Sequence, residues 1–209
     1  MLNPHHYKTY VGPFARWDEV REVIPRFLIE TCGLQPHHRL VDIGCGTLRI
    51  GRPLINYLNR AHYTGLEASA EALAIGRCKE LPRDLEATKA PLFLVNSDFD
   101  LAGVQRGFDF ALAHEVFIHC GHAQLAQCAA QLVTADFRGT FILTIRIGAQ
   151  DIETGRPHYD HASHEAVTYR RETLDSALDP WAIEEVHDCQ LKDVADEATR
   201  RMIVCRRQD

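Results

Sequence analysis

The chain lacks the features that mark three broad classes of protein. No apolar run approaches the roughly 18–20 residues that a membrane-spanning helix needs. Residues 1–6 show no apolar stretch of the signal-peptide kind, so we expect no secretory leader. Its 23 lysines and arginines face 29 acidic residues, and this net charge of −6 leaves no basic footprint for nucleic acid or an anionic membrane.

A disulfide framework is also not indicated. The seven cysteines are odd in number, scattered along the chain and free of the C-x-x-C pattern. Reduced thiols in the cytoplasm are the simplest interpretation. The length of 209 residues suits a single domain over residues 1–209 with a sizeable core, and nothing in it repeats.

One stretch organises the rest of the chain. Leu40–Ile43 is an apolar, β-branched run that predicts a strand buried on both faces, and it breaks at Gly44-Cys45-Gly46. A helix pattern resumes over 48–59. A strand, a glycine turn and a helix direct backbone N–H groups at a ligand, which glycines allow to approach closely.

The residues of this turn decide between two nucleotide cofactors. The dinucleotide fingerprint G-x-G-x-x-G has Arg49 in place of its third glycine, so that match is incomplete. Asp42, inside the strand, suits a ligand that brings an ammonium and a sulfonium near the turn. Here the sequence resembles the class I S-adenosylmethionine-dependent methyltransferases, in particular small bacterial members with a Gly-Cys-Gly-x-Leu-Arg-x-Gly signature.

The resemblance covers nearly the whole chain and implies its fold. We expect an α/β, Rossmann-like three-layer sandwich with a seven-stranded, mostly parallel sheet in the order 3-2-1-4-5-7-6, strand seven antiparallel. The patterns predict strands at 39–43, 62–67, 91–98, 108–114, 139–147, 181–187 and 201–206, and helices at 14–32, 48–59, 70–81, 121–137 and 169–178. Without a crossover, the last two strands must pair antiparallel.

The remaining segments are predicted as connections. Residues 1–36 form an N-terminal leader and a cap helix, which in similar methyltransferases helps roof the cofactor. Residues 82–91 read as a charged connection, and 148–168 as a lid loop over the substrate, because long loops in compact domains are usually functional or mobile.

The cofactor residues follow from strand ends and from the resemblance. Glu67 ends the second strand, roughly 20 residues past the turn, where an acidic residue accepts ribose hydroxyls. The resemblance implies that Asp98 accepts the adenine amino group; the alternative is an N-cap of a short helix near Phe99. The full expected set is Asp42, Gly44, Cys45, Gly46, Arg49, Glu67, Ala68, Ser97, Asp98, Phe99, His114 and Glu115.

The catalytic residues are harder to assign. A methyl group on a sulfonium is already activated, so the protein mainly aligns the nucleophile and excludes water. A base is needed only for a protonated nucleophile. His119, at the exit of the fourth strand, is the first candidate, and a structural histidine paired to the backbone is the alternative. His158 in the lid loop is the second candidate.

The lid loop also holds the expected substrate contacts. His158, His161 and His164 recur every third residue with Asp160 and Glu165 among them, which fits a lid, a solvated loop or a metal site. We assign no metal. The expected substrate-binding residues are Tyr7, Tyr10, Arg146, Tyr159 and His161. Tyr7 and Tyr10 have plain packing as the alternative, and Arg146 either meets a substrate carboxylate or anchors the lid.

These patterns favour S-adenosylmethionine-dependent methyl transfer to an O or N nucleophile of a small molecule. The alternatives are a non-catalytic module that binds S-adenosylmethionine or S-adenosylhomocysteine, and an NAD-dependent oxidoreductase, for which the Tyr-x-x-x-Lys pair is absent. The expected partner is a small-molecule substrate, with neither nucleic acid nor membrane. The sequence assigns no oligomeric state.

Overall fold

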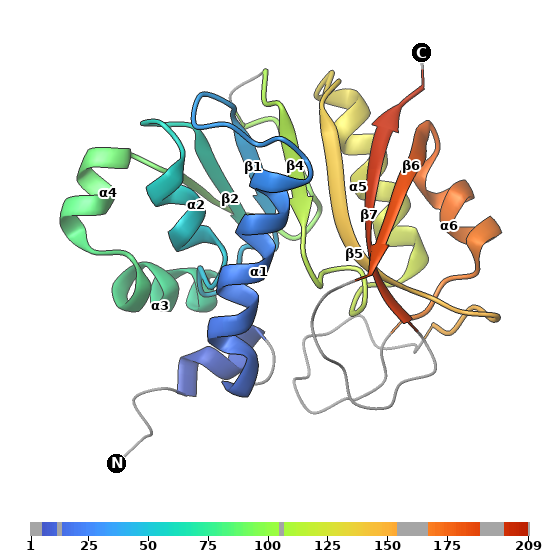
Figure 1. The fold of residues 1–209 in the computed structure, drawn as a ribbon, viewed down its shortest axis with the longest axis horizontal. Coiled ribbons are helices and arrows are strands. Elements are labelled where there is room, and N and C mark those ends of the chain that lie inside the picture. Colours follow the sequence, from blue (N-terminus) through green and yellow to red (C-terminus); the bar gives the residue numbers. More distant parts are fainter. Residues whose placement is uncertain (1–5, 12–13, 105–106, 154–166, 189–198, 209) are drawn as a thin grey trace. The chain divides into compact units, whose positions relative to one another are not determined.

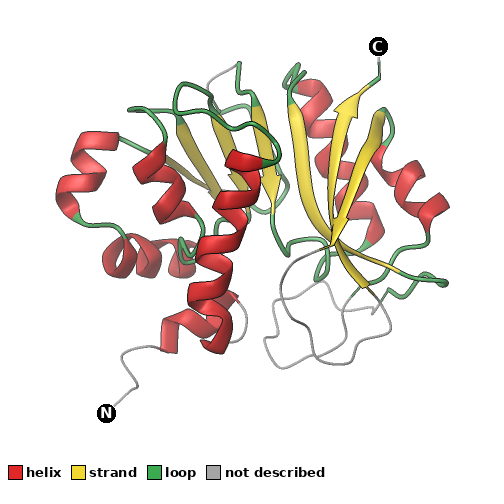
Figure 2. Ribbon diagram, viewed as in Figure 1, coloured by secondary structure: helices red, strands yellow, loops and turns green. Residues whose placement is uncertain are grey.

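The structure is a computed structural model that describes residues 6–11, 14–104, 107–153, 167–188 and 199–208 (Figure 1). Helices and strands alternate along most of these residues (Figure 2). In chain order the elements are η1 (His6–Val11), η2 (Phe14–Arg16), α1 (Trp17–Glu30), β1 (Leu40–Ile43), α2 (Gly51–Tyr57), β2 (Tyr63–Glu67), α3 (Ala70–Glu80), α4 (Arg83–Lys89), β3 (Leu92–Val95), β4 (Phe110–Ala113), α5 (His122–Thr134), β5 (Thr140–Ile147), α6 (Arg171–Leu178), β6 (Trp181–Asp188) and β7 (Thr199–Arg207).

The strands form a seven-stranded sheet in the order β3-β2-β1-β4-β5-β7-β6. β7 runs antiparallel to both β5 and β6, whereas β1, β2 and β3 pair in parallel, as do β4 and β5. The predicted fold class and its antiparallel ending are therefore confirmed. Contacts divide the chain into two compact units, residues 1–97 and 98–209, which are described separately below. The single domain over 1–209 stays a prediction.

In the first unit, β1 is buried at all four residues, as its mostly apolar sequence predicts. Asp42 lies opposite Gly65 of β2, and Glu67 lies opposite Val95 of β3. Both α2 and α3 contact β2. Gly51 permits the close approach of α2, because a Cβ there would lie 2.5 Å from the Tyr63 hydroxyl.

Three predictions about local structure are wrong. The helix expected from Leu48 begins at Gly51, because Leu48 has a φ of 63°, in the left-handed region. The connection expected at 82–91 contains α4, which buries no residue and so has no apolar periodicity to signal it. No helix begins near Phe99, whose φ is 60°, so the N-cap alternative for Asp98 is also wrong.

In the second unit, α5 buries the predicted stripe Leu125, Cys128, Ala129 and Leu132. Trp181 of β6 donates its indole N–H to the Ala129 carbonyl at 3.3 Å and packs edge-on against Phe141 of β5. α5 thus lies on the Phe141 side of β5. Because side chains alternate along a strand, Thr144 and Arg146 project from the opposite side.

The loop after β5 is described only at its two ends. Ile147 forms an isolated bridge with Tyr169, and Ile152 forms one with Thr168. Residues 154–166, in the middle of the predicted lid, lie outside the described residues. Across the described ranges, no helix is long and apolar enough to cross a membrane.

Candidate functional site

The glycine turn after β1 has a backbone that only glycine adopts readily. Gly44 and Gly46 have φ values of 71° and 54°, in the left-handed region where a side chain strains the chain. The N–H groups of Gly44 and Cys45 donate to the Leu66 carbonyl at 2.8 and 2.9 Å. Two backbone hydrogen bonds therefore fix the turn to the end of β2.

Glu67, at the end of β2, faces this turn. Its side chain is buried, with 1% of the residue exposed. One carboxylate oxygen accepts the Gly46 N–H at 2.8 Å, and the other accepts the Ser69 N–H at 2.9 Å. Glu67 thereby joins the glycine turn to the start of α3. The ribose contact predicted for Glu67 stays a prediction.

Asp42 provides a second buried carboxylate in the same unit. Burial raises the pKa of Asp42 from 3.8 to about 7; the hydrogen bond from Tyr63 acts against this, and the charge of Glu67 adds to it. The Tyr63 hydroxyl donates to Asp42 at 2.6 Å. A cation beside Asp42 would favour the ionised carboxylate. Sequence reasoning missed Tyr63, because a tyrosine in a buried strand gives no indication of the partner of its hydroxyl group.

The N-terminal leader lies against the glycine turn. A Cβ on Gly46 would overlap Cγ1 of Val11, at the end of η1. Tyr7 of the same short helix donates its hydroxyl to Glu80 and packs edge-on against Trp17, with ring centroids 5.8 Å apart. Burial and this hydrogen bond raise the pKa of Tyr7 to about 12. These contacts fix η1 beside the turn.

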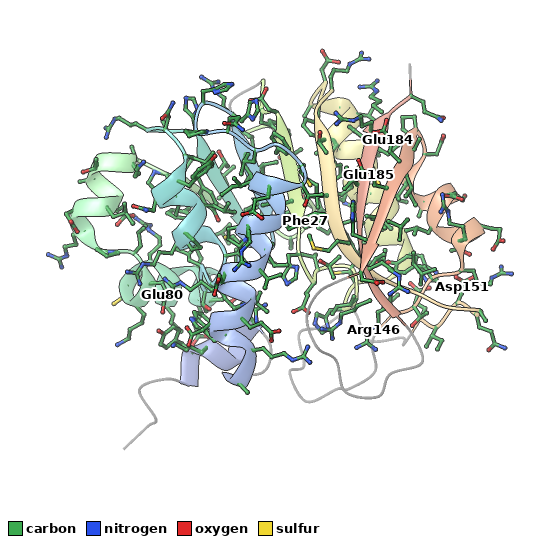
Figure 3. The ribbon with its side chains drawn as sticks, in the orientation of Figure 1. Phe27, Glu80, Arg146, Asp151, Glu184 and Glu185 are labelled. Carbon is green, nitrogen blue, oxygen red and sulfur yellow. The ribbon has the colours of Figure 1, made fainter. Side chains whose placement is uncertain are left out.

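Glu80, at the end of α3, joins the leader to α1 and α2 (Figure 3). Its carboxylate lies 2.8 Å from Nη1 of Arg21 and 3.6 Å from Nη1 of Arg52. Sequence reasoning missed this hub, because Glu80 shows there only as one more charged residue at a helix end. The substrate-binding role of Tyr7 stays a prediction, and the Tyr10 side chain lies outside the described residues.

The other predicted cofactor residues of the first unit differ in exposure. Cys45 and Arg49 are buried, with 6% and 4% of each residue exposed. Burial raises the pKa of the Cys45 thiol well above its ordinary value, so the thiol is protonated near neutral pH. Ala68 and Ser97, which follow β2 and β3, are exposed.

A chain of polar contacts crosses three strands of the second unit. His114 follows β4 and is buried; its Nδ1 lies 2.7 Å from Oγ1 of Thr144. The other ring nitrogen lies 3.8 Å from the Glu115 carboxylate, which accepts Nη1–H of Arg200 at 2.7 Å. Glu115 has a φ of 58°, a strained conformation of the kind that clusters at functional sites.

The second unit also contains the predicted residues Asp98, Phe99 and His119. Asp98 is exposed, and its carbonyl accepts a hydrogen bond from Gln127 at 3.1 Å. Phe99 packs against Phe117 with ring centroids 5.8 Å apart. His119 is exposed, and its backbone N–H donates to the Val116 carbonyl at 3.0 Å, which closes the turn that follows β4.

The histidine loop falls outside what the structure describes. His158, Tyr159, His161 and His164 belong to residues 154–166, as do Asp160 and Glu165. Among the described residues, no group of three or more His, Cys, Asp or Glu side chains is arranged to hold a metal ion. The roles predicted for this loop therefore stay predictions.

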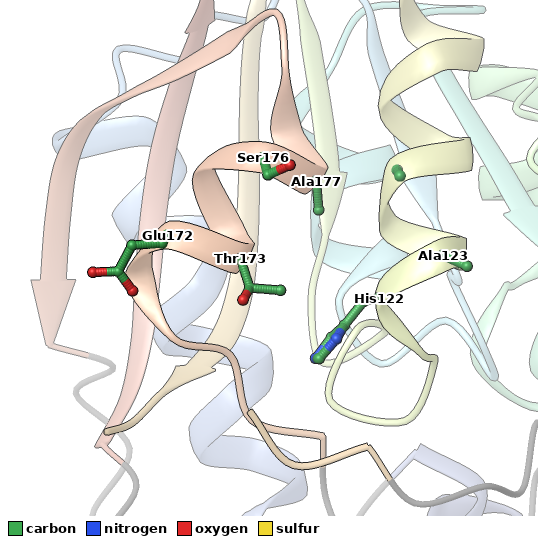
Figure 4. Close-up of a pocket in the computed structure, with 7 residues that line it drawn as sticks. His122, Ala123, Glu172, Thr173, Ser176 and Ala177 are labelled. Atoms are coloured by element: carbon green, nitrogen blue, oxygen red, sulfur yellow. The ribbon is translucent and has the colours of Figure 1, made fainter. Parts of the chain in front are cut away.

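A groove of about 460 Å³ lies between α5 and α6 (Figure 4). Its wall includes His122, whose ring packs on Tyr169 at 4.3 Å, together with Thr173 and Ser176. None of its seven lining residues belongs to the predicted site. We therefore place the candidate site on the strand ends and not in this groove.

Comparison with known proteins agrees with this geometry. Residues 41–136 match the family model described as a methyltransferase domain. That range holds the glycine turn, Glu67 and the polar residues after β4. This part of the chain is similar to a methyltransferase domain, which confirms the predicted resemblance to the class I S-adenosylmethionine-dependent methyltransferases.

Solved structures with the same fold include three methyltransferases. Magnesium protoporphyrin IX methyltransferase from Synechocystis PCC 6803, with bound S-adenosylmethionine, is 16% identical with a TM-score of 0.62, over 92% of this chain and 79% of that one. An S-adenosylmethionine-dependent methyltransferase from Clostridium acetobutylicum is 14% identical (TM-score 0.64, 92% of each chain). The glycopeptide N-methyltransferase MtfA, with bound S-adenosylmethionine, is 12% identical (TM-score 0.66, 90% and 94%).

Proposed function

We propose that this protein is an S-adenosylmethionine-dependent methyltransferase that methylates an O or N nucleophile of a small molecule. The observation that carries the proposal is the glycine turn, in which the Gly46 N–H is held by the buried Glu67 carboxylate while Asp42 lies buried beside it on β1. Two buried carboxylates beside one turn suit a ligand with a positive charge.

Several residues of the first unit have proposed roles toward the cofactor. Glu67, with one carboxylate oxygen on the turn, accepts hydrogen bonds from the two ribose hydroxyls. Asp42 balances the positive charge of the ligand, and Gly44 and Gly46 let the backbone approach it. The leader, held by Tyr7 on Glu80 and by Val11 on Gly46, roofs the turn.

In the second unit, Asp98 is proposed to receive the adenine amino group, with Phe99, His114 and Glu115 as further cofactor contacts. When bound, S-adenosylmethionine supplies a methyl group activated by positive sulfur. The protein then aligns the acceptor and excludes water. His119, exposed in the turn after β4, is the proposed base, which takes the acceptor proton as the new bond forms.

Small-molecule acceptors agree with the relatives and with the charge. Two of these relatives are named as methyltransferases of magnesium protoporphyrin IX and of a glycopeptide. This chain has a net charge of −6, which disfavours nucleic acid. The six cysteines that the structure describes form no disulfide bond, which supports a cytoplasmic location, where thiols stay reduced.

Calorimetry tests the cofactor assignment. We expect the protein to bind S-adenosylmethionine and S-adenosylhomocysteine but not NAD. Binding of NAD alone would reject the proposal in favour of an oxidoreductase. Binding of S-adenosylhomocysteine without any methylated product, across a broad panel of alcohols, phenols and amines, would instead favour a non-catalytic binding module.

A further inference from the structure

One polar side chain interrupts the buried apolar part of β5. Thr144 lies between Leu143 and Ile145, and none of its surface is exposed. Valine has nearly the same shape and would leave no hydroxyl to satisfy at this position. A buried hydroxyl is costly unless it is hydrogen-bonded, so the threonine calls for a partner.

The partner of this hydroxyl is His114, the residue that follows β4. Its Nδ1 lies 2.7 Å from Oγ1 of Thr144, within hydrogen-bond range. The two strands pair in parallel, and their last pair in register is Ala113 with Leu143. The bond therefore joins the residues that come next on each chain. Only 8% of His114 is exposed, so the contact is shielded from water.

The hydroxyl decides which ring nitrogen carries the proton. A threonine hydroxyl has one proton to donate, and a neutral imidazole has one N–H and one acceptor nitrogen. Within the described ranges, Oγ1 of Thr144 has no hydrogen-bond partner other than Nδ1 of His114. The hydroxyl proton therefore goes to Nδ1. Because Nδ1 accepts, the proton of the neutral ring lies on Nε2.

The carboxylate of Glu115 lies near the other ring nitrogen. Its Oε2 is 3.8 Å from Nε2 of His114, while its Oε1 accepts Nη1–H of Arg200 at 2.7 Å. A negative charge near Nε2 favours a proton on that nitrogen. The hydroxyl at Nδ1 and the carboxylate near Nε2 therefore favour the same tautomer.

We propose that Thr144 is a positioning residue of the candidate site, whose hydroxyl holds His114 as a hydrogen-bond donor through Nε2–H and not as a base. This inference rests on the proposed function for the ligand that His114 meets, whereas the position of the ring proton does not depend on it. A ring that is already oriented loses less conformational freedom when a ligand binds. The role of base then stays with His119.

Nitrogen NMR of the full chain tests the tautomer without any ligand. Long-range ¹H–¹⁵N spectra at about pH 8, where an unperturbed imidazole is neutral, distinguish a protonated ring nitrogen from an accepting one. The His114 signals are assigned by their absence in His114→Gln or, if that variant does not fold, through the backbone of the unmodified protein. We expect the proton on Nε2 and a hydrogen-bonded Nδ1. A proton on Nδ1, alone or together with one on Nε2, would overturn the proposal.

Two substitutions separate the hydroxyl of Thr144 from its packing. Thr144→Val keeps the shape and removes the O–H, so the Nδ1 signal should move to that of a nitrogen without a hydrogen bond. S-adenosylhomocysteine should then bind about 2- to 12-fold more weakly, the range for loss of one hydrogen bond. Thr144→Ser keeps the hydroxyl and should restore both the signal and the Kd. An unchanged Kd in the valine variant, or an equally weak serine variant, would refute the positioning role. If the valine variant does not fold, the spectrum of the unmodified protein still decides the tautomer.

Thr140→Val is the matched control. Thr140 is a buried threonine four residues earlier on β5, so it projects from the same face of the sheet at the other end of the strand. This variant should leave the His114 signals and the Kd unchanged. Changes as large as those of Thr144→Val would show that the bond to His114 is not their cause, and would reject the proposal.

The same measurements keep this inference distinct from the proposed function. If His114 has the expected tautomer and Nδ1 responds to Thr144→Val, but S-adenosylhomocysteine does not bind, the proposed function fails and the tautomer assignment stands. If S-adenosylhomocysteine binds the unmodified protein and Thr144→Val equally well, the positioning role fails and the proposed function stands.

Discussion

Replacing Glu67 by alanine should damage stability and cofactor binding by amounts that the structure allows us to estimate. The substitution leaves the Gly46 and Ser69 N–H groups without their acceptor. The Gly46 hydrogen bond is buried, so its loss should cost about 1–3 kcal/mol, whereas water replaces part of the half-buried Ser69 contact. We expect the free energy of unfolding to fall by about 2–4 kcal/mol, a decrease in Tm of roughly 4–16 °C for a chain of this size.

The same substitution should weaken S-adenosylhomocysteine binding through a separate effect. Loss of the acceptor for the ribose hydroxyls should cost about 1–3 kcal/mol, which raises the Kd roughly 5- to 150-fold. Glu67→Gln should lie between the two proteins, because its amide keeps one oxygen and turns an N–H donor toward another donor. Calorimetry below the Tm of the variant measures the Kd, and thermal unfolding without ligand measures stability.

Glu71→Ala is the matched control, because Glu71 is an exposed acidic residue in the first turn of α3, four residues from Glu67. It should change Tm and Kd little. A Glu67→Ala protein with the Kd of the unmodified protein would remove Glu67 from the ribose role. An unchanged Tm would show that its two hydrogen bonds do not hold the turn.

Three further substitutions test other parts of the site. The pKa of Asp42 is about 7 in the folded protein and 3.8 ordinarily, so the native state favours the protonated form. The free energy of unfolding should therefore decrease from about pH 4 to about pH 7. Denaturation of Asp42→Asn at several pH values should show a smaller decrease over this range. His119→Ala should lower turnover with cofactor affinity kept, and full turnover in a steady-state assay would exclude it as the base. Tyr7→Phe removes the hydrogen bond to Glu80 and should speed S-adenosylhomocysteine release in stopped-flow measurements, whereas an unchanged rate would show that the leader does not roof the turn.

Much of the fold was predictable because burial imposes a pattern of apolar residues on the sequence. β1 and β5 are mostly apolar and β-branched because both of their faces are covered, and α5 shows an apolar stripe because one of its faces is covered. α4 escaped prediction because none of its residues is buried, so packing imposes no period on its sequence. The start of α2 was misplaced because the left-handed conformation of Leu48 has no glycine to signal it.

Some residues of the candidate site were predictable from the sequence and others were not. Gly44, Gly46 and Glu67 were predictable because a glycine turn and a strand end have local sequence signals. Tyr63, Glu80 and Arg200 were not, because their roles arise from contacts with residues 21, 73 and 85 positions away along the chain. A single sequence contains no sign of such pairs until the topology brings them together.

The two buried carboxylates of the first unit have an electrostatic consequence for ligand binding. Asp42 and Glu67 lie beside one turn, where each charge makes the other less favourable. A ligand of positive charge relieves this cost, and the proposed cofactor carries such a charge on its sulfonium.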